Sequence, residues 1–290
     1  MQLSSCPLIK LVNRSLTMIE CESPYTLDSI FPNTSTRLSS RQALHLFHKS
    51  STLLDMLLIK VPNFSSSSPA YFLDSDGSIQ SSIISLLSPL CTLHDVTNDF
   101  EIFSAATQLS SFSEGSRLFM EEDGNMVYDE ETNSHLAGYV SFVDPRSRFL
   151  GSRIVAVEGC IEADNLKDQG FYNMWRIMNG VAEGRPVVRS EPEHLNFQCF
   201  NGEKGFESEI NTYAAAVIRK SDELDMGYNE KIVNFRVLDS AGNFVGQVFD
   251  QYYNFCLVKM HKMPTSELLL ENGEKINAWL PSYTAMNISK

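Results

Sequence analysis

The sequence lacks the short motifs that most often identify an enzyme. It contains no glycine-rich loop of the kind that holds phosphate groups, no Cys/His set with metal-site spacing and no nucleophile elbow. The sequence does not exclude a catalytic site assembled from residues far apart in the chain. An example is a hydrolase in which His135 or His194 lies beside a cysteine or a pair of carboxylates. The sequence therefore favours a non-enzymatic role and predicts no metal and no cofactor.

Long apolar runs and closely spaced cysteines are also missing. No apolar stretch approaches the roughly 18 residues that a bilayer-spanning helix needs, and the N-terminus lacks a basic start followed by an unbroken apolar run. The six cysteines form no C-x-x-C pair and lie mostly in apolar surroundings, as reduced core residues do. We expect an intracellular protein of a reducing compartment, without a transmembrane segment.

Positive charge is scarce. The 23 basic and 36 acidic residues give a net charge of −13, and residues 111–290 carry 17 of the basic and 27 of the acidic residues. Binding to naked nucleic acid depends on Lys and Arg replacing the counterions of the phosphates. We expect such binding only through a local basic patch, and otherwise a protein partner or a cargo already coated by protein.

Residues 1–113 are rich in Ser and Leu and contain few charges. From Ser39 to Leu58, the apolar residues Leu44, Phe47, Leu54 and Leu58 recur at helical spacing, which predicts a helix. Further helical segments are expected in residues 79–93, interrupted by a proline, and in residues 98–109. This part is predicted to be a mainly helical region.

Residues 114–290 instead show short apolar and aromatic runs separated by turn residues, as in antiparallel β-structure. Turn signals lie at Asp123–Asn125 and at Asp239–Asn243, and the second predicts a hairpin between its flanking strands. One inserted helix is expected at about Asp164–Met178. The predicted fold class is α+β, with a helical N-terminal part and a mainly antiparallel, jelly-roll-like β-sandwich. Strands are expected at Arg117–Glu121, Asn125–Tyr128, Leu136–Val143, Arg153–Cys160, Val187–Val188, Leu195–Phe200, Ile210–Ile218, Ile232–Leu238 and Phe244–Val258.

Several groups of polar residues resemble part of a metal site but lack one or more of the required ligands. The run Asp74–Ser78 resembles the start of a calcium loop, but Leu86 stands near the place of the closing glutamate, which favours a plain turn. His45 and His48 are spaced to face one metal from a helix, yet no third ligand is evident. An acidic cluster in residues 121–131 is interpreted as a solvated loop.

A turn at Asp144-Pro145 and three nearby arginines form the main candidate binding site. Arg146, Arg148 and Arg153 concentrate positive charge in an otherwise acidic half. They are suited to bind phosphate or to form ion pairs with neighbouring carboxylates. Asp144 ends an apolar strand, so its carboxylate is also suited to cap the turn through local backbone N–H groups.

The stretch Ala137–Phe200 resembles the plant virus movement proteins of the thirty-kilodalton superfamily. An apolar strand ends in Val-Asp, an arginine follows closely, and Leu-Gly-Ser leads into another strand. The resemblance implies that Asp144 is the signature aspartate, with Arg146 as its companion, in a jelly-roll-like domain. It also implies self-association and transport of viral nucleoprotein through the cell junctions of an infected host. Because this chain is acidic, the cargo would be coated by basic nucleocapsid protein.

A viral structural or host-interaction protein without a transport role is the other non-enzymatic alternative. Its subunit interface would use exposed aromatic residues, and the candidates are Tyr252, Tyr253 and Phe255. The same aromatic residues would fill the core of a sandwich if no interface forms.

Overall fold

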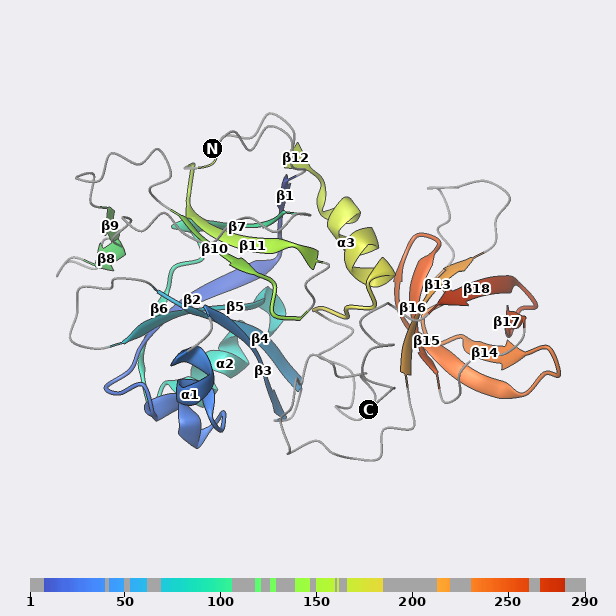
Figure 1. Cartoon of the computed structure of the whole chain (residues 1–290), viewed down its shortest axis with the longest axis horizontal. Coiled ribbons are helices and arrows are strands. Elements are labelled where there is room, and N and C mark those ends of the chain that lie inside the picture. The colour runs from blue at the N-terminus through green and yellow to red at the C-terminus, as the bar shows by residue number, and fades with distance from the viewer. Residues whose placement is uncertain are drawn as a thin grey trace. The chain divides into compact units, whose positions relative to one another are not determined.

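The chain forms two compact units, Met1–Gln169 and Gly170–Lys290. The computed structural model describes residues 8–39, 42–49, 53–61, 69–105, 118–120, 126–128, 139–146, 150–159, 161, 166–184, 213–219, 231–260 and 267–279. The two regions expected from composition, 1–113 and 114–290, divide the chain at a different place. One sheet of the first unit takes strands from both sides of residue 113 (Figure 1).

The first unit contains two five-stranded sheets. One sheet has the order β10-β11-β7-β1-β12, and all its pairs are antiparallel except β1 with β12. Its strands are β1 (Leu8–Lys10), β7 (Phe100–Ala105), β10 (Tyr139–Val143), β11 (Ser152–Val157) and β12 (Leu166–Lys167). The other sheet has the order β3-β4-β5-β2-β6 and is antiparallel throughout. Its strands are β2 (Arg14–Glu20), β3 (Ala43–Lys49), β4 (Leu53–Lys60), β5 (Ala70–Asp76) and β6 (Thr92–Asp95).

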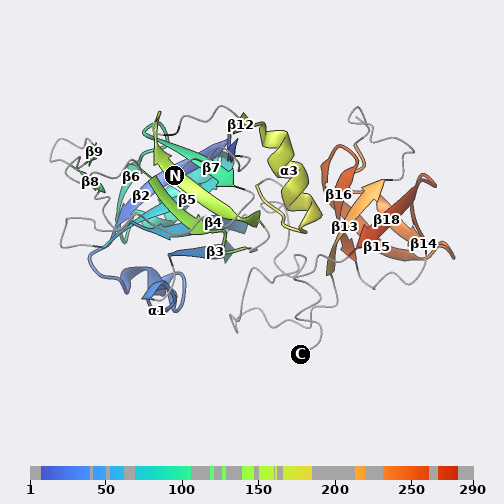
Figure 2. The same cartoon turned by 45° about the horizontal axis from the view of Figure 1, so that its top comes forward.

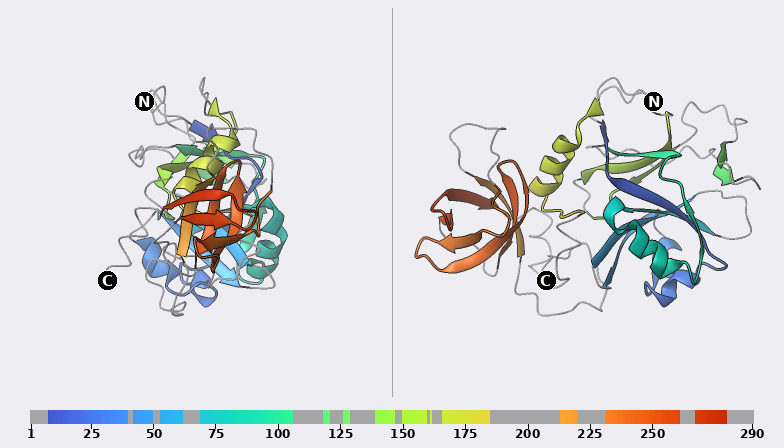
Figure 3. Two further views of the ribbon diagram at one scale, coloured as in Figure 1. Left: turned by 90° about the vertical axis from the view of Figure 1, so that its right-hand side faces the viewer. Right: turned by 180° about the vertical axis from the view of Figure 1, so that it is seen from behind.

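The two sheets pack face to face, as Figures 1 and 2 show. The rings of Phe72 on β5 and Phe100 on β7 meet edge to face, with centroids 5.0 Å apart. The helices lie on the outer side of the sheet that contains β2–β6 (Figure 3). They are η2 (Thr26–Ser29), α1 (Thr34–Ser39), η3 (Gly77–Ile79) and α2 (Gln80–Leu87). A separate hairpin pairs β8 (Leu118–Met120) with β9 (Met126–Tyr128).

The second unit contains α3 (Gln169–Met178) and a closed barrel, visible in Figures 1 and 3. The barrel order is β13-β16-β15-β14-β17-β18. Its strands are β13 (Tyr213–Arg219), β14 (Arg236–Asp239), β15 (Phe244–Tyr252), β16 (Phe255–Met260), β17 (Leu268–Leu270) and β18 (Lys275–Trp279). Buried aliphatic residues such as Val237, Val258 and Leu270 fill the barrel.

The predicted fold class is wrong, because the chain is mostly β-structure and the N-terminal part is not helical. The segment predicted as a helix at Ser39–Leu58 forms most of the β3–β4 hairpin, in which Leu44 lies opposite Leu58. The segment at 98–109 contains β7. In place of the predicted sandwich, the second unit has a closed barrel, and β10 and β11 belong to the first unit. Pairing between strands buries the same leucines that suggested a helical face.

Several local predictions are confirmed. Helix α3 lies inside the expected range 164–178, and α2 begins within 79–93. The predicted hairpin joins β14 to β15, and the Asp239 carboxylate accepts hydrogen bonds from the backbone N–H groups of Ala241 and Asn243. The turn at 123–125 and the strands at 187–188 and 195–200 lie outside the described residues. None of the described helices has the length and apolar composition needed to cross a membrane.

Candidate functional site

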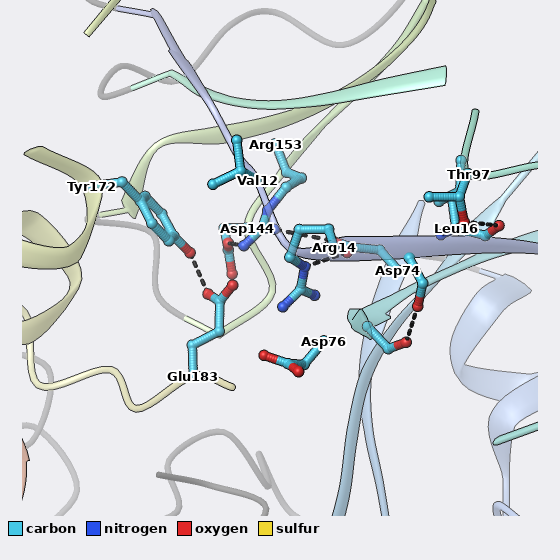
Figure 4. Close-up of polar contacts among 12 residues, drawn as sticks. Val12, Arg14, Leu16, Asp74, Asp76, Thr97, Asp144, Arg153, Tyr172 and Glu183 are labelled. Atoms are coloured by element: carbon cyan, nitrogen blue, oxygen red, sulfur yellow. Dashed lines mark hydrogen bonds and ion pairs between the residues drawn. The ribbon is translucent and has the colours of Figure 1, made fainter. Parts of the chain in front are cut away.

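Five charged residues form a buried group between the two sheets of the first unit, here called the arginine–aspartate cluster. It consists of Arg14, Asp74, Asp144, Arg146 and Arg153. Figure 4 labels four of them, Arg14, Asp74, Asp144 and Arg153. Arg14 is the first residue of β2, Asp74 lies in β5 and Arg153 lies in β11. Asp144 and Arg146 lie in the turn after β10. Three arginines and two aspartates give the cluster a formal charge of +1.

Strand register brings Arg14 and Asp74 together. On the β2–β5 pair, Arg14 lies opposite Asp76 and Leu16 lies opposite Asp74. Arg14 and Asp74 are therefore diagonal neighbours on the same face of the sheet, within reach of a long side chain. The Arg14 Nε donates to Asp74 Oδ1 at 2.6 Å.

Asp144 holds the turn that follows β10. Its Oδ1 accepts from the backbone N–H of Arg146 at 3.0 Å and from the Arg146 Nε at 2.9 Å, and its Oδ2 accepts from the Arg146 Nη2 at 2.6 Å. Burial by itself would raise the pKa of Asp144. The charges of Arg146 and Arg153 and the hydrogen bonds from Arg146 outweigh it and lower the pKa to about 2. Asp144 is thus held as a carboxylate.

Arg153 connects the two halves of the cluster. Its side chain is fully buried, and it donates from Nη1 to Asp74 Oδ2 at 3.0 Å and from Nη2 to Asp144 Oδ2 at 3.4 Å. Buried ion pairs are costly to break, because the remaining charge is left without compensation. The cluster therefore fixes the position of Arg14 with respect to both sheets.

A cavity of about 380 Å³ lies beside Arg14, where the chain passes from β1 to β2 and from β6 to β7. Its wall carries both signs of charge, from Lys10 and Arg14 and from Glu101 and Glu158. The Lys10 ammonium forms an ion pair with the Glu101 carboxylate. Polar and apolar residues complete the lining: Leu11, Val12, Asn13, Leu16, Thr97, Asn98, Phe100 and Ile102. The arrangement is suited to a small polar molecule that presents both an acidic and a basic group.

The structure brings Asp144, Arg146 and Arg153 together, whereas Arg148 lies outside the described residues. Both local interpretations are present, since Asp144 caps its turn and the arginines pair with carboxylates. The binding role assigned to these residues stays a prediction. Sequence reasoning gave Arg14 no role and placed Asp74 in a turn, whereas Asp74 lies in β5. The available signal was an aspartate within the apolar strand AYFLDSD.

The histidines and the calcium-like loop have ordinary partners. The His45 Nε2 lies 2.5 Å from Asp55 Oδ1 in the core, and His48 packs edge-on against Phe31. Asp76 caps η3 by accepting from the backbone N–H of Ser78 at 2.9 Å. Within the described parts of the chain, no three His, Cys, Asp or Glu side chains are grouped to hold a metal ion.

The predicted interface residues lie at the end of β15 and in β16. Phe255 is buried against Ile177 and Leu257 in the core of the second unit, and Tyr252 packs against the same group. Tyr253 is half-buried, and its ring meets that of Tyr252 edge to face, with the ring centroids 4.5 Å apart. A role for these residues in self-association stays a prediction.

Two polar contacts stabilise the second unit. Arg176 on α3 donates to Asp250 on β15 at 2.5 Å, and both side chains are buried. The Tyr172 hydroxyl donates to the Glu183 carboxylate, a pair drawn in Figure 4. These contacts tie α3 and the segment that follows it to one another and to the barrel.

Comparison with known proteins gives a fold and no family. No protein-family model matches the sequence, and no curated protein matches it. Among solved structures, the chain is similar to the glycine cleavage system aminomethyltransferase T from Bartonella henselae, with a TM-score of 0.60 and 10% sequence identity. The similarity covers 96% of this chain and 86% of that protein. It shows a similar fold over the matched part of the chain.

Proposed function

We propose that this chain binds a small molecule that carries both an amine and an acidic group, in the cavity beside Arg14. The observation that carries the proposal is the cavity wall, which places Lys10 and Arg14 together with Glu101 and Glu158 around about 380 Å³. This volume lies within the range of small-molecule sites, about 300–1,000 Å³.

The charges on the wall define the ligand class. A ligand carboxylate would be recognised by Lys10 and Arg14, and a ligand ammonium by Glu101 or Glu158. Because Asp74 holds the Arg14 guanidinium at 2.6 Å, this cation is positioned before a ligand arrives. The fold supports the same class, since the similar structure is named for the transfer of an aminomethyl group, a one-carbon amine unit.

Isothermal titration of the full chain tests the proposal, with glycine and N-methylglycine as ligands and with acetate and methylamine as singly charged controls. We expect saturable binding of the amino acids and at least about tenfold weaker binding of either control, because each control loses one charge-assisted contact. Lys10→Gln and Glu101→Gln should weaken binding, whereas Lys275→Gln, in the exposed Lys275–Glu267 pair of the other unit, should not. Absence of heat at millimolar ligand, or unchanged binding when Glu101→Gln and Glu158→Gln are combined, would contradict the proposal.

The non-enzymatic assembly role, including viral movement, remains an alternative proposal. Arg146 and Arg153 are 4% and 0% exposed, so cargo contact through them would require breaking buried ion pairs. A salt series with single-stranded RNA and with nucleocapsid-coated RNA tests it, with light scattering on the same sample. Salt-sensitive binding by an oligomer would support the alternative, and a monomer that binds neither cargo would exclude it.

A further inference from the structure

Cys21 and Cys91 lie opposite one another at the end of the β2–β6 pair. The register runs from Thr17 opposite Asp95 to Glu20 opposite Thr92, and one further step places Cys21 opposite Cys91. Their sulfur atoms are 3.1 Å apart, and both residues are free thiols. They are 70 positions apart in the sequence, so the fold brings them into contact.

The backbone geometry at this position suits a disulfide. The N–H of Cys21 donates to the carbonyl of Pro69, on the side of β5, so Cys21 occupies a non-hydrogen-bonded position toward β6. Opposed residues at such positions have Cα atoms about 4.5 Å apart, with their side chains close together. Disulfides span Cα separations of about 4.4–6.8 Å. A bond between the sulfurs therefore requires rotation of side chains and little movement of the strands.

The two thiols differ in accessibility. Cys21 is 1% exposed, whereas Cys91 is half-exposed and follows the last turn of α2, where its N–H donates to the carbonyl of Leu87. The hydrogen bond between the sulfurs lowers the pKa of Cys91 and, together with burial, raises the pKa of Cys21. The thiolate, which is the nucleophile in disulfide exchange, thus forms on the accessible sulfur.

We propose that Cys21 and Cys91 form a dithiol–disulfide exchange site that reacts with a low-molecular-weight disulfide. The Cys91 thiolate attacks one sulfur of the small disulfide, the bond between its sulfurs breaks, and the first small thiolate leaves with a proton from solvent. The Cys21 sulfur then attacks the Cys91 sulfur of the mixed disulfide, and the second small thiolate leaves with the Cys21 proton. The protein loses two protons and two electrons in all, and the small disulfide gains them and is reduced to two thiols.

The bond would join the start of the edge strand β6 to the end of β2. Strand β6 pairs with β2 alone among the described strands of its sheet, and its residues are exposed or half-exposed. A covalent link at this edge opposes separation of β6 and closes a long loop of the unfolded chain. The reduced and oxidised forms should therefore differ in resistance to unfolding.

The test is equilibration of the folded full chain in mixtures of reduced and oxidised glutathione. The thiols are then trapped by alkylation, and peptides are mapped by mass spectrometry without reduction. We expect a peptide pair joined through Cys21 and Cys91 that increases with the oxidised fraction and disappears on return to reduced glutathione. Cys256, which is fully buried in the barrel, serves as the internal control and should keep its thiol.

Two variants test the order of the steps. Cys21→Ala should accumulate glutathione on Cys91, because the resolving thiol is missing, and Cys91→Ala should leave Cys21 unmodified, because it is buried. Persistence of both thiols in the wild-type chain under fully oxidised glutathione would overturn the proposal. A stable mixed disulfide on wild-type Cys91, or a bond from Cys91 to a different cysteine, would overturn it as well.

Discussion

Arg153 donates a hydrogen bond from Nη1 to Oδ2 of Asp74 at 3.0 Å, between two residues 79 positions apart in the sequence. Both side chains have no solvent exposure. The contact links β11 of one sheet to β5 of the other. The stability of the first unit thus depends on a few charged residues. Replacing each of them should lower the free energy of unfolding by an amount that can be measured separately.

Asp74→Asn should strongly destabilise the chain. The change keeps the shape of the side chain and removes the negative charge that Arg14 and Arg153 share. Loss of one partner of a buried ion pair costs roughly 3–5 kcal/mol, and urea unfolding followed by circular dichroism would measure this decrease in the free energy of unfolding. Asp99→Asn, at an exposed position of the same unit, is the matched control and should change it by less than about 0.5 kcal/mol. Equal stability of the two variants would contradict the buried ion pairs that Asp74 forms with Arg14 and Arg153.

The stability should depend on pH through Asp144. The pKa of this residue is about 2 in the folded chain and close to its ordinary value of 3.8 in the unfolded chain. Between these values the unfolded chain binds more protons, so the contribution is fully present above pH 5 and decreases as the pH falls toward 2. Its size is roughly 2 kcal/mol. Urea unfolding between pH 6 and pH 2 should show a smaller loss of stability in Asp144→Asn than in the wild-type chain. If the free energy of unfolding fell equally with pH in both, the low pKa of Asp144 would be contradicted.

Asp250→Asn should destabilise the second unit. The change leaves the buried Arg176 without a carboxylate on β15, which costs roughly 3–5 kcal/mol. The two tryptophans of the chain, Trp175 and Trp279, both belong to this unit, so their fluorescence reports its unfolding. A lower urea midpoint for tryptophan emission is expected, with Glu271→Gln at an exposed turn as the control. An unchanged midpoint would show that the ion pair does not support the barrel.

Gly246→Ala should disturb the barrel. A Cβ atom at this position would lie 2.5 Å from the carbonyl oxygen of Lys259 and 2.8 Å from the sulfur of Met260, so strands β15 and β16 would have to separate. Overpacking of this kind costs about 1–3 kcal/mol. Gly77→Ala is the matched control, because its Cβ would be 3.4 Å from the nearest atom, and a change within about 1 kcal/mol is expected. Thermal unfolding of the two variants compares them directly.

The N-terminal half shows why a local pattern can predict the wrong element. Leu44, Leu54 and Leu58 fit a helical face, and leucine is a good helix former. In the structure, these residues lie in two paired strands and are fully buried. Residues 54–59 of β4 are buried on both faces of the sheet, so its sequence LLDMLLIK, apolar except for Asp55 and the terminal lysine, follows neither the helical nor the alternating period. The strands on either side of β4 decide its conformation.

The sequence by itself determined features whose interactions lie within a few residues. These include helix α3, the β14–β15 hairpin with its Asp239 turn, and the cap that Asp144 provides two residues before Arg146. The tertiary structure alone decided the contacts between residues far apart. Asp74 meets Arg14 across 60 positions, and Cys21 meets Cys91 across 70. The physical reason is that turns and helices satisfy their hydrogen bonds locally, whereas the partner of a strand residue is set by register and by the packing of one sheet on another.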